Sequence, residues 1–130
     1  MRGDCMILGV GIDLMEIVRM EEALSKEGFL DRFFSPEEKE YIVSRGKGAA
    51  ESAAGCFAAK EAALKAMGCG IALPLRQVAV LHRESGAPYY DLREQAAEKM
   101  KEMGGERIHL SITHSQNTAA AVAIVEGKEK

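Results

Sequence analysis

Apolar positions along the chain fall into short runs and helical stripes that predict a mixture of strands and helices. The run MILGVGID at residues 6–13 ends on an acid and predicts a short buried strand. Gly9 and Gly11 lie two residues apart, so they share one face of that strand and permit close approach of another backbone. Residues 14–30 carry apolar positions at helical spacing and predict the first helix.

The segment FFSPEEKEYI contains the features of a helix start. Ser35 suits the N-cap, Pro36 suits the first helical position, and Glu38 completes a capping box. We expect this helix to end near Gly46. A longer helix follows over residues 49–67, roughly 28 Å long at 1.5 Å per residue. It is apolar nearly all round, so it should be largely buried.

The second half of the chain predicts two hairpins separated by a helix. The segment QVAVLHRESGAPYYDL predicts two strands around a turn at residues 85–88. Residues 92–103 predict an exposed helix, which Gly104 closes. The tail RIHLSITHSQNTAAAVAIVE predicts two antiparallel strands with a turn at residues 115–117.

Length and composition indicate one globular domain. The 130 residues are 47% hydrophobic and 28% charged, which is typical of a chain that buries a core. We predict an α+β fold, a single compact domain at residues 6–126 with a long central helix packed on a small antiparallel sheet. Residues 1–5 would be an N-terminal extension and residues 127–130 a charged tail.

Charge and cysteine content narrow the function classes. No apolar run is long enough to span a bilayer, and the first residues lack the cleavage site of a signal peptide. The net charge of −3 gives no reason to expect nucleic acid or a membrane surface as partner. The three cysteines are an odd number without CxxC spacing, which indicates neither a disulfide framework nor a zinc site. We expect a reducing, cytoplasmic location.

Three charges stand in the middle of the long apolar helix: Lys60, Glu61 and Lys65. Glu61 and Lys65 have the spacing of a surface ion pair, which would contribute only about 0.2–0.5 kcal/mol. Charges on a helix that is buried need partners, however. A carboxylate and ammonium groups in a half-buried groove suit a site that binds a cation and an anion.

Two further residues have both a structural and a functional interpretation. Asp13 closes the first predicted strand and could pair with Glu61 around Mg²⁺, or it could cap the following helix. His114 lies on the face of its strand that it shares with Ile112, where it could be a core histidine or a ligand-binding group.

Three segments together resemble a known enzyme family. GVGIDLMEIVRM, CFAAKEAALKAMGCGI and HLSITHSQNTAAAVAIVE are similar to segments of bacterial holo-acyl-carrier-protein synthases, which are small phosphopantetheinyl transferases. The resemblance covers nearly the whole chain in the expected order. It implies the phosphopantetheinyl transferase fold and Mg²⁺-dependent transfer of the phosphopantetheine arm of coenzyme A to a serine of apo acyl carrier protein, in fatty acid biosynthesis. The other product is adenosine 3′,5′-bisphosphate. It also implies a homotrimer with sites at subunit interfaces.

The resemblance also implies roles for individual residues. Asp13 and Glu61 match Mg²⁺ ligands, Lys65 matches a lysine on the phosphate side, and His114 matches a histidine near the coenzyme A phosphates. Lys60 could reach the nucleotide or hold Glu61 in place. Glu61 or a metal-bound water could take the proton from the acceptor serine, and the sequence leaves both open.

An acidic carrier protein needs a basic docking face on this acidic chain. Arg19 and Lys26 lie seven residues apart on the first predicted helix, so they would share a side and contact the carrier. The chain departs from the family's pattern nearby, because Glu21 and Glu22 stand where relatives tend to be basic. Cys56 likewise stands where relatives often carry a basic residue.

Two other functions use the same residues. A Mg²⁺-dependent nucleotide phosphohydrolase would need Asp13, Glu61 and Lys65 equally. A non-catalytic oligomeric binding module would use the hairpins and the small-residue face of the long helix as an interface.

Overall fold

A computed structural model describes residues 4–69 and 73–129. Along the chain the elements are β1 (Met6–Glu16), α1 (Ile17–Leu24), α2 (Phe29–Phe33), α3 (Pro36–Ser44), the 3₁₀ turn η1 (Gly46–Gly48), α4 (Ala49–Ala66), the 3₁₀ turn η2 (Leu75–Gln77), β2 (Val78–His82), β3 (Pro88–Leu92), α5 (Glu94–Glu102), β4 (Gly105–His114) and β5 (Thr118–Gly127). Residues 70–72, between α4 and η2, lie outside the described residues, as do the start of the predicted N-terminal extension and the end of the predicted charged tail.

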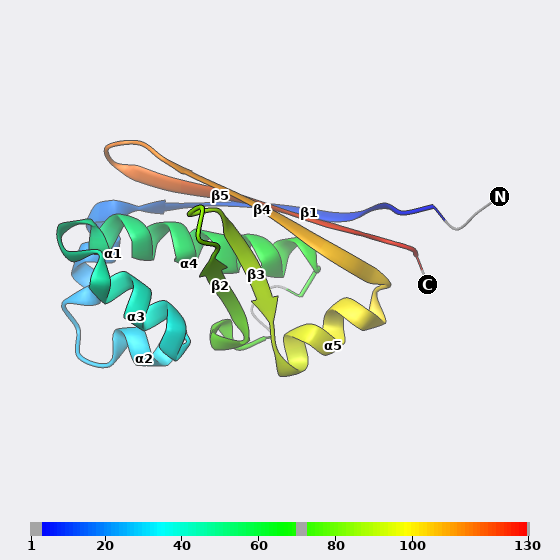
Figure 1. The fold of residues 1–130 in the computed structure, drawn as a ribbon, viewed down its shortest axis with the longest axis horizontal. Coiled ribbons are helices and arrows are strands. Elements are labelled where there is room, and N and C mark those ends of the chain that lie inside the picture. Colours follow the sequence, from blue (N-terminus) through cyan, green and yellow to red (C-terminus); the bar gives the residue numbers. More distant parts are fainter. Residues whose placement is uncertain (1–3, 70–72, 130) are drawn as a thin grey trace.

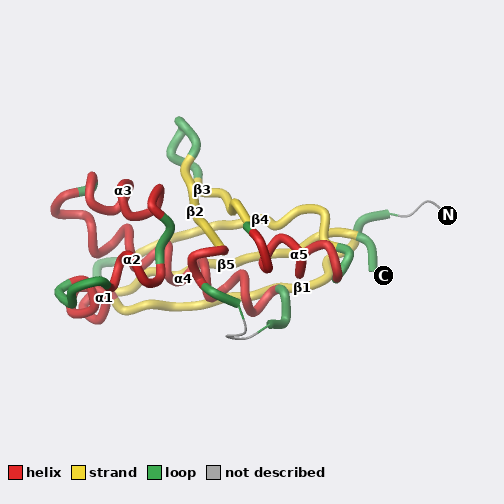
Figure 2. Tube along the Cα trace, turned by 90° about the horizontal axis from the view of Figure 1, so that it is seen from below, coloured by secondary structure: helices red, strands yellow, loops and turns green. Residues whose placement is uncertain are grey.

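The strands β1, β5 and β4 form one antiparallel sheet with β5 in the centre, while β2 and β3 form a separate hairpin. Helix α4 packs along one face of the three-stranded sheet and contacts all three strands (Figure 1). The helices α1, α2 and α3 gather at one end of the molecule, and the β2–β3 hairpin stands beside β4 (Figure 2). The predicted α+β fold, with a long central helix on a small antiparallel sheet, is confirmed.

Two glycines let the backbone of β1 approach the backbone of α4. A Cβ atom added at Gly9 would lie 1.8 Å from the carbonyl oxygen of Ala66, and one added at Gly11 would lie 1.9 Å from that of Ala62. No side chain fits at either position, since real Cβ contacts are far longer. The close approach predicted from the spacing of the two glycines is confirmed.

The strand β1 is longer and more exposed than the sequence predicted. It continues to Glu16, which pairs with Thr118 of β5, so cross-strand pairing overrides the local helical pattern. The predicted helix over residues 14–30 is therefore confirmed only in part, and its bounds are wrong. Helix α1 begins only at Ile17, and Gly28, with φ of 82°, separates it from α2.

One face of β1 has no cover among the described residues, which corrects the prediction of a buried strand. Ile7, Val10, Ile12 and Leu14 are each between 57% and 66% exposed, and all four point away from α4. They continue across the sheet into apolar residues of β5, because the pairing places Val10 and Ile12 opposite Ile124 and Val122. The sheet therefore has one packed face and one open apolar face.

Most local predictions for the remaining elements are confirmed. Ser35 caps α3: its backbone N–H donates to Glu38 Oε1 over 2.8 Å, and its hydroxyl accepts from the Glu38 N–H over 3.3 Å. Helix α4 is buried on nearly every side, as its composition predicted. Both hairpins form, and α5 ends before Gly104, whose φ is 82°. No helix in the described ranges is long and apolar enough to cross a membrane.

Gly9→Ala and Gly11→Ala should each lower the free energy of unfolding by at least about 1–3 kcal/mol, because the new methyl group meets a backbone carbonyl that cannot move aside. Denaturant unfolding of the purified variants measures this. Gly48→Ala is the matched control, since its Cβ would come no closer than 4.0 Å to the Glu51 carboxylate. Wild-type stability in both strand variants would contradict the packing described here.

Candidate active site

A cavity of about 440 Å³ opens between the end of β1, helix α1 and helix α4. We call it the carboxylate cavity. Its charged and aromatic lining residues include Asp13, Arg19, Glu22, Lys26, Phe57 and Glu61. It therefore brings together two of the carboxylates and two of the cations that the sequence singled out.

Lys65 stands beside this cavity and joins β1 to α4. Its ammonium group donates to Asp13 Oδ1 over 3.0 Å and to the carbonyl oxygen of Ile12 over 3.1 Å. Lys65 therefore pairs with Asp13 and does not form the surface ion pair with Glu61 that their spacing allowed. Asp13 does not cap α1 either, because the N-cap residue is Glu16 and has no side-chain cap bond.

Glu61 is a half-buried carboxylate in this cluster. Burial raises its pKa above the ordinary value, the charge of Asp13 raises it further, and the Lys65 ammonium opposes the rise. A carboxylate in this setting holds a proton more readily than a solvent-exposed one, or gains a cation to compensate its charge. Either behaviour suits a site where protons or metal ions are exchanged.

The donor set of the carboxylate cavity fits Mg²⁺. Mg²⁺ takes oxygen ligands and is commonly held by one or two carboxylates together with phosphate oxygens and water. Asp13 and Glu61 provide two carboxylates that interact electrostatically across the cavity. Within residues 4–69 and 73–129 there is no group of three or more His, Cys, Asp or Glu side chains that could hold a metal. The remaining ligands would therefore come from substrate and solvent.

Lys60 does not reach this cavity, which corrects its assignment as a ligand-binding residue. Its side chain is fully buried, and its ammonium group donates to Glu38 Oε1 over 2.7 Å and to the carbonyl oxygens of Leu75 and Val78 over 2.9 and 3.0 Å. Burial lowers the pKa of Lys60, and the carboxylate of Glu38 opposes this shift. All three ammonium protons are used inside the protein, so none remains for a ligand.

Arg19 and Lys26, the two residues expected to contact a carrier protein, both line the carboxylate cavity, but they do not lie on one face of a helix. Helix α1 ends at Leu24, so Lys26 lies beyond it and the spacing argument made for Arg19 and Lys26 fails. The fold nevertheless places both side chains at the same cavity. Glu22 lines the cavity as well and offsets part of their positive charge.

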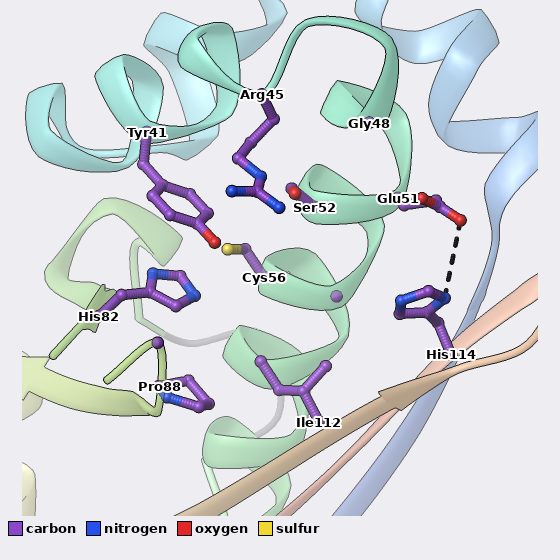
Figure 3. Close-up of a pocket in the computed structure, with 12 residues that line it drawn as sticks. Tyr41, Arg45, Gly48, Glu51, Ser52, Cys56, His82, Pro88, Ile112 and His114 are labelled. Carbon is purple, nitrogen blue, oxygen red and sulfur yellow. Dashed lines mark ion pairs between the residues drawn. The ribbon is translucent and has the colours of Figure 1, made fainter. Parts of the chain in front are cut away.

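A second cavity, of about 250 Å³, lies between α3, α4, the β2–β3 hairpin and the end of β4 (Figure 3). We call it the arginine cavity. Its polar and aromatic lining includes Tyr41, Arg45, Glu51, Ser52, His82 and His114. His114 is 53% exposed, and its Nδ1 lies 3.6 Å from Glu51 Oε2, so it is not a core histidine.

Sequence reasoning singled out His114 and Cys56 but missed most of the other residues of this cavity. Tyr41 and His82 stack with ring centroids 3.9 Å apart, although 41 positions separate them in the chain. They come from separate elements, so no motif or periodicity connects them. Only the packing of the hairpin against α3 brings them together.

The two cavities lie on opposite sides of α4. Ser52 lines the arginine cavity and Glu61 the carboxylate cavity, and the two residues are nine positions apart on the helix. At about 100° per residue, nine positions correspond to about two and a half helical turns, so the two side chains point in opposite directions. Within one chain, His114 lines the cavity on the Ser52 side of the helix and Glu61 lines the other cavity.

Comparison with known proteins identifies the family. A model of the 4′-phosphopantetheinyl transferase superfamily matches residues 9–123. The chain belongs to this superfamily. A holo-[acyl-carrier-protein] synthase of Treponema denticola is 50% identical over 123 residues, covering 94% of this chain and 100% of that protein.

Solved structures of superfamily relatives have the same fold. The holo-[acyl-carrier-protein] synthase of Neisseria meningitidis aligns with a TM-score of 0.85 at 29% identity, covering 92% of this chain and 98% of that one. A holo-(acyl-carrier-protein) synthase from Bacillus anthracis, in complex with coenzyme A (3′,5′-ADP), aligns with a TM-score of 0.80 at 32% identity, covering 95% and 99%. The family resemblance drawn from the three sequence segments is confirmed.

In the metal-free protein, the pKa of Glu61 should lie above its ordinary value of 4.5 and respond to its two charged neighbours. Asp13→Asn should lower this pKa, because a negative charge is removed, and Lys65→Met should raise it, because a positive charge is removed. Carboxyl-detected NMR titration of Glu61 measures both shifts. A Glu61 pKa that is unchanged in Asp13→Asn would contradict the electrostatic coupling described above.

Proposed function

We propose that this protein transfers the 4′-phosphopantetheine arm of coenzyme A to a serine of an apo acyl carrier protein and releases adenosine 3′,5′-bisphosphate. The observation that carries the proposal is the cluster of Asp13, Glu61 and Lys65 at one cavity in a chain of the phosphopantetheinyl transferase superfamily. A diphosphate is densely negative, and this cluster offers two ligands for a divalent cation and one ammonium group beside them.

In the proposed reaction the serine hydroxyl oxygen forms a bond to the phosphorus atom that carries the pantetheine arm. The bond from that phosphorus to the bridging oxygen breaks, and the oxygen leaves with adenosine 3′,5′-bisphosphate. Glu61 or a water molecule in the cavity receives the proton of the serine hydroxyl, and the place of Glu61 in the cavity supports the first choice. Mg²⁺ held by Asp13 and Glu61 would neutralise negative charge on the diphosphate.

The cations around the site have separate proposed tasks. Lys65 stabilises the charge that develops on the leaving phosphate. Its ammonium group is hydrogen-bonded to Asp13, so it lies beside the proposed metal ligands. His114 contacts the phosphates of coenzyme A from the arginine cavity. Arg19 and Lys26 attract the acidic carrier protein, and their place at the carboxylate cavity would bring its serine close to Glu61.

We further propose that the active unit is a homotrimer with its sites at subunit interfaces. The two cavities point away from each other within one chain, so one coenzyme A would span the carboxylate cavity of one subunit and the arginine cavity of another. The open apolar face of the sheet gives such an assembly a surface to bury, because exposed apolar patches of this kind mark interaction sites. A cytoplasmic location and a role in fatty acid biosynthesis complete the proposal.

Asp13→Asn and Glu61→Gln should each lower the transfer rate by on the order of 10²–10³ while the protein remains folded, because each removes a preorganised charge. The assay is mass spectrometry of apo acyl carrier protein after incubation with coenzyme A and Mg²⁺, which detects the added arm. A chelator should abolish transfer by the wild type reversibly. Glu98→Gln, an exposed acid on α5, is the control and should keep the wild-type rate.

Three outcomes would overturn these assignments. Near-normal transfer by both carboxylate variants at limiting Mg²⁺ would exclude them as metal ligands. Release of adenosine 3′,5′-bisphosphate at equal rates with and without carrier protein would instead identify a phosphohydrolase. A wild-type protein that binds Mg²⁺ but yields no product would indicate a non-catalytic binding module.

The shared-site proposal predicts complementation between two inactive variants. Glu61→Gln damages the carboxylate cavity and His114→Ala damages the arginine cavity, so a mixed trimer contains some interfaces in which both halves are intact. The two variants, unfolded together and refolded as a mixture, should transfer faster than either variant refolded alone. Sedimentation velocity should show a trimer at micromolar concentration. A fully active monomer, or a mixture no faster than its components, would exclude shared sites.

A further inference from the structure

We infer that Glu22 determines which carrier proteins this protein accepts. The matching carrier presents a cation to Glu22 and carboxylates on either side of that cation, which contact Arg19 and Lys26. The inference rests on the proposed function and adds a specificity-determining residue to it. It depends on three charges that line the carboxylate cavity, on the lack of an ion pair at each of them, and on the apolar surface beside them.

Arg19, Glu22 and Lys26 are exposed, and all three line the carboxylate cavity. Arg19 and Glu22 lie three residues apart on α1, a spacing that places two side chains on the same side of a helix. Lys26 follows the C-cap residue of that helix, Ser25. The chain therefore offers a positive, a negative and a positive group in succession along the wall that α1 and its C-terminal end provide.

None of these three charges has an ion pair within the part of the chain that the structure describes. A glutamate three residues after an arginine on a helix can pair with it, yet Glu22 and Arg19 do not pair. Other surface charges do: Lys39, for example, lies 2.8 Å from Asp31. The three charges at the cavity are therefore available to opposite charges of a partner.

The surface beside these charges suits a protein partner. The apolar residues that line the same cavity come from β1, α1, α2 and α4: Leu14, Met15, Ala23, Phe29 and Phe57. Leu14 is 66% exposed, so part of this apolar surface is open to a partner. Protein interfaces typically combine an apolar centre with a charged rim. A carrier protein could therefore bury apolar side chains here while its charged groups meet those of α1.

The negative charge of Glu22 discriminates between carrier proteins. A carrier that is acidic over its whole docking surface would be attracted by Arg19 and Lys26 but repelled by Glu22, because like charges placed together across an interface disfavour binding. A lysine or arginine of the carrier opposite Glu22 replaces this repulsion with attraction. Specificity commonly arises from such a repulsive element combined with attractive ones. The three charges thus favour carriers with an acid, a base and an acid in succession.

The spacing of the charges suits one face of a helix in the carrier. Arg19 and Glu22 are separated by about 4.5 Å along the axis of α1, at 1.5 Å per residue. Side chains three or four residues apart on a partner helix lie on one face at a similar separation. A carrier helix that lies along α1 can therefore present an acid to Arg19 and a base to Glu22 at the same time.

The test is a set of charge reversals on both proteins. The acceptor is the apo acyl carrier protein of Treponema denticola, the organism of a relative that is 50% identical to this chain. Each surface charge of the carrier is reversed in turn, acids to lysine and bases to glutamate. The KM and kcat for each carrier are then measured with the wild type, Glu22→Lys, Glu22→Gln and Glu21→Lys.

One position of the carrier should be coupled to Glu22. With the wild type, a cation at that position should give a KM lower by roughly three- to tenfold than a carboxylate does, as for a charge pair at an exposed rim, with little change in kcat. Glu22→Lys should reverse this preference, and Glu22→Gln should nearly abolish it. Glu21→Lys is the matched control, because it makes the same charge reversal on the neighbouring residue, which does not line the cavity. It should keep the preference of the wild type.

The inference fails on any of three results: no carrier position with a preference that depends on Glu22, the same change of preference in Glu21→Lys, or a lower kcat at unchanged KM in Glu22→Gln. Each can occur in a protein that still transfers the arm, so the proposed function would stand. A wild type that transfers to none of the carriers would defeat the proposed function itself. Glu22 is exposed, so its variants should fold, and circular dichroism checks this.

Discussion

The contact between the backbones of β1 and α4 is the constraint on which the rest of the structure depends. Without side chains at Gly9 and Gly11, the strand lies directly against the carbonyl groups of Ala66 and Ala62. This closeness brings Asp13 within reach of the Lys65 ammonium group on the next turn of the helix. A larger residue at either glycine would push β1 away from α4 and so move Asp13 away from Glu61 and Lys65.

A second constraint explains why the centre of an apolar helix carries charges. Lys60 and Glu38 form a fully buried ion pair. The Lys60 ammonium group also donates to the carbonyl oxygens of Leu75 and Val78, and the Glu38 carboxylate also accepts from the backbone N–H groups of Ser35 and Val80. Removing one partner of such a pair typically costs about 3–5 kcal/mol, because the other charge is left without compensation. The pair therefore ties α3 and the β2–β3 hairpin to α4, and so positions the walls of the arginine cavity.

Helix α4 consequently serves both cavities, yet it also separates them. Its side toward α1 carries Phe57 and Glu61, and its opposite side carries Ser52 and Cys56. A single chain presents two separate cavities and one open apolar sheet face. Both features are accounted for if neighbouring subunits pack through that face and join unlike cavities, as the proposed trimer requires.

The sequence by itself determined the elements whose cause is local. The capping box at Ser35 and Glu38, the close-packing glycines of β1 and the two hairpins follow from short-range rules, and all are found in the structure. The family motifs also selected Asp13, Glu61 and Lys65 as one group, and the fold places them together.

Only the tertiary structure decided the features that depend on distant partners. Pairing with β5 extended β1 through Glu16 although the local pattern favoured a helix. Lys60 is a core residue because the carboxylate of Glu38, 22 positions away in the chain, accepts a hydrogen bond from its ammonium group. The arginine cavity exists because α3 and the β2–β3 hairpin pack on the same side of α4, and no spacing within one segment encodes that arrangement. Local sequence patterns reflect interactions between residues close together in the chain, whereas the burial of a side chain and the pairing of a strand depend on residues that the fold brings near from distant positions.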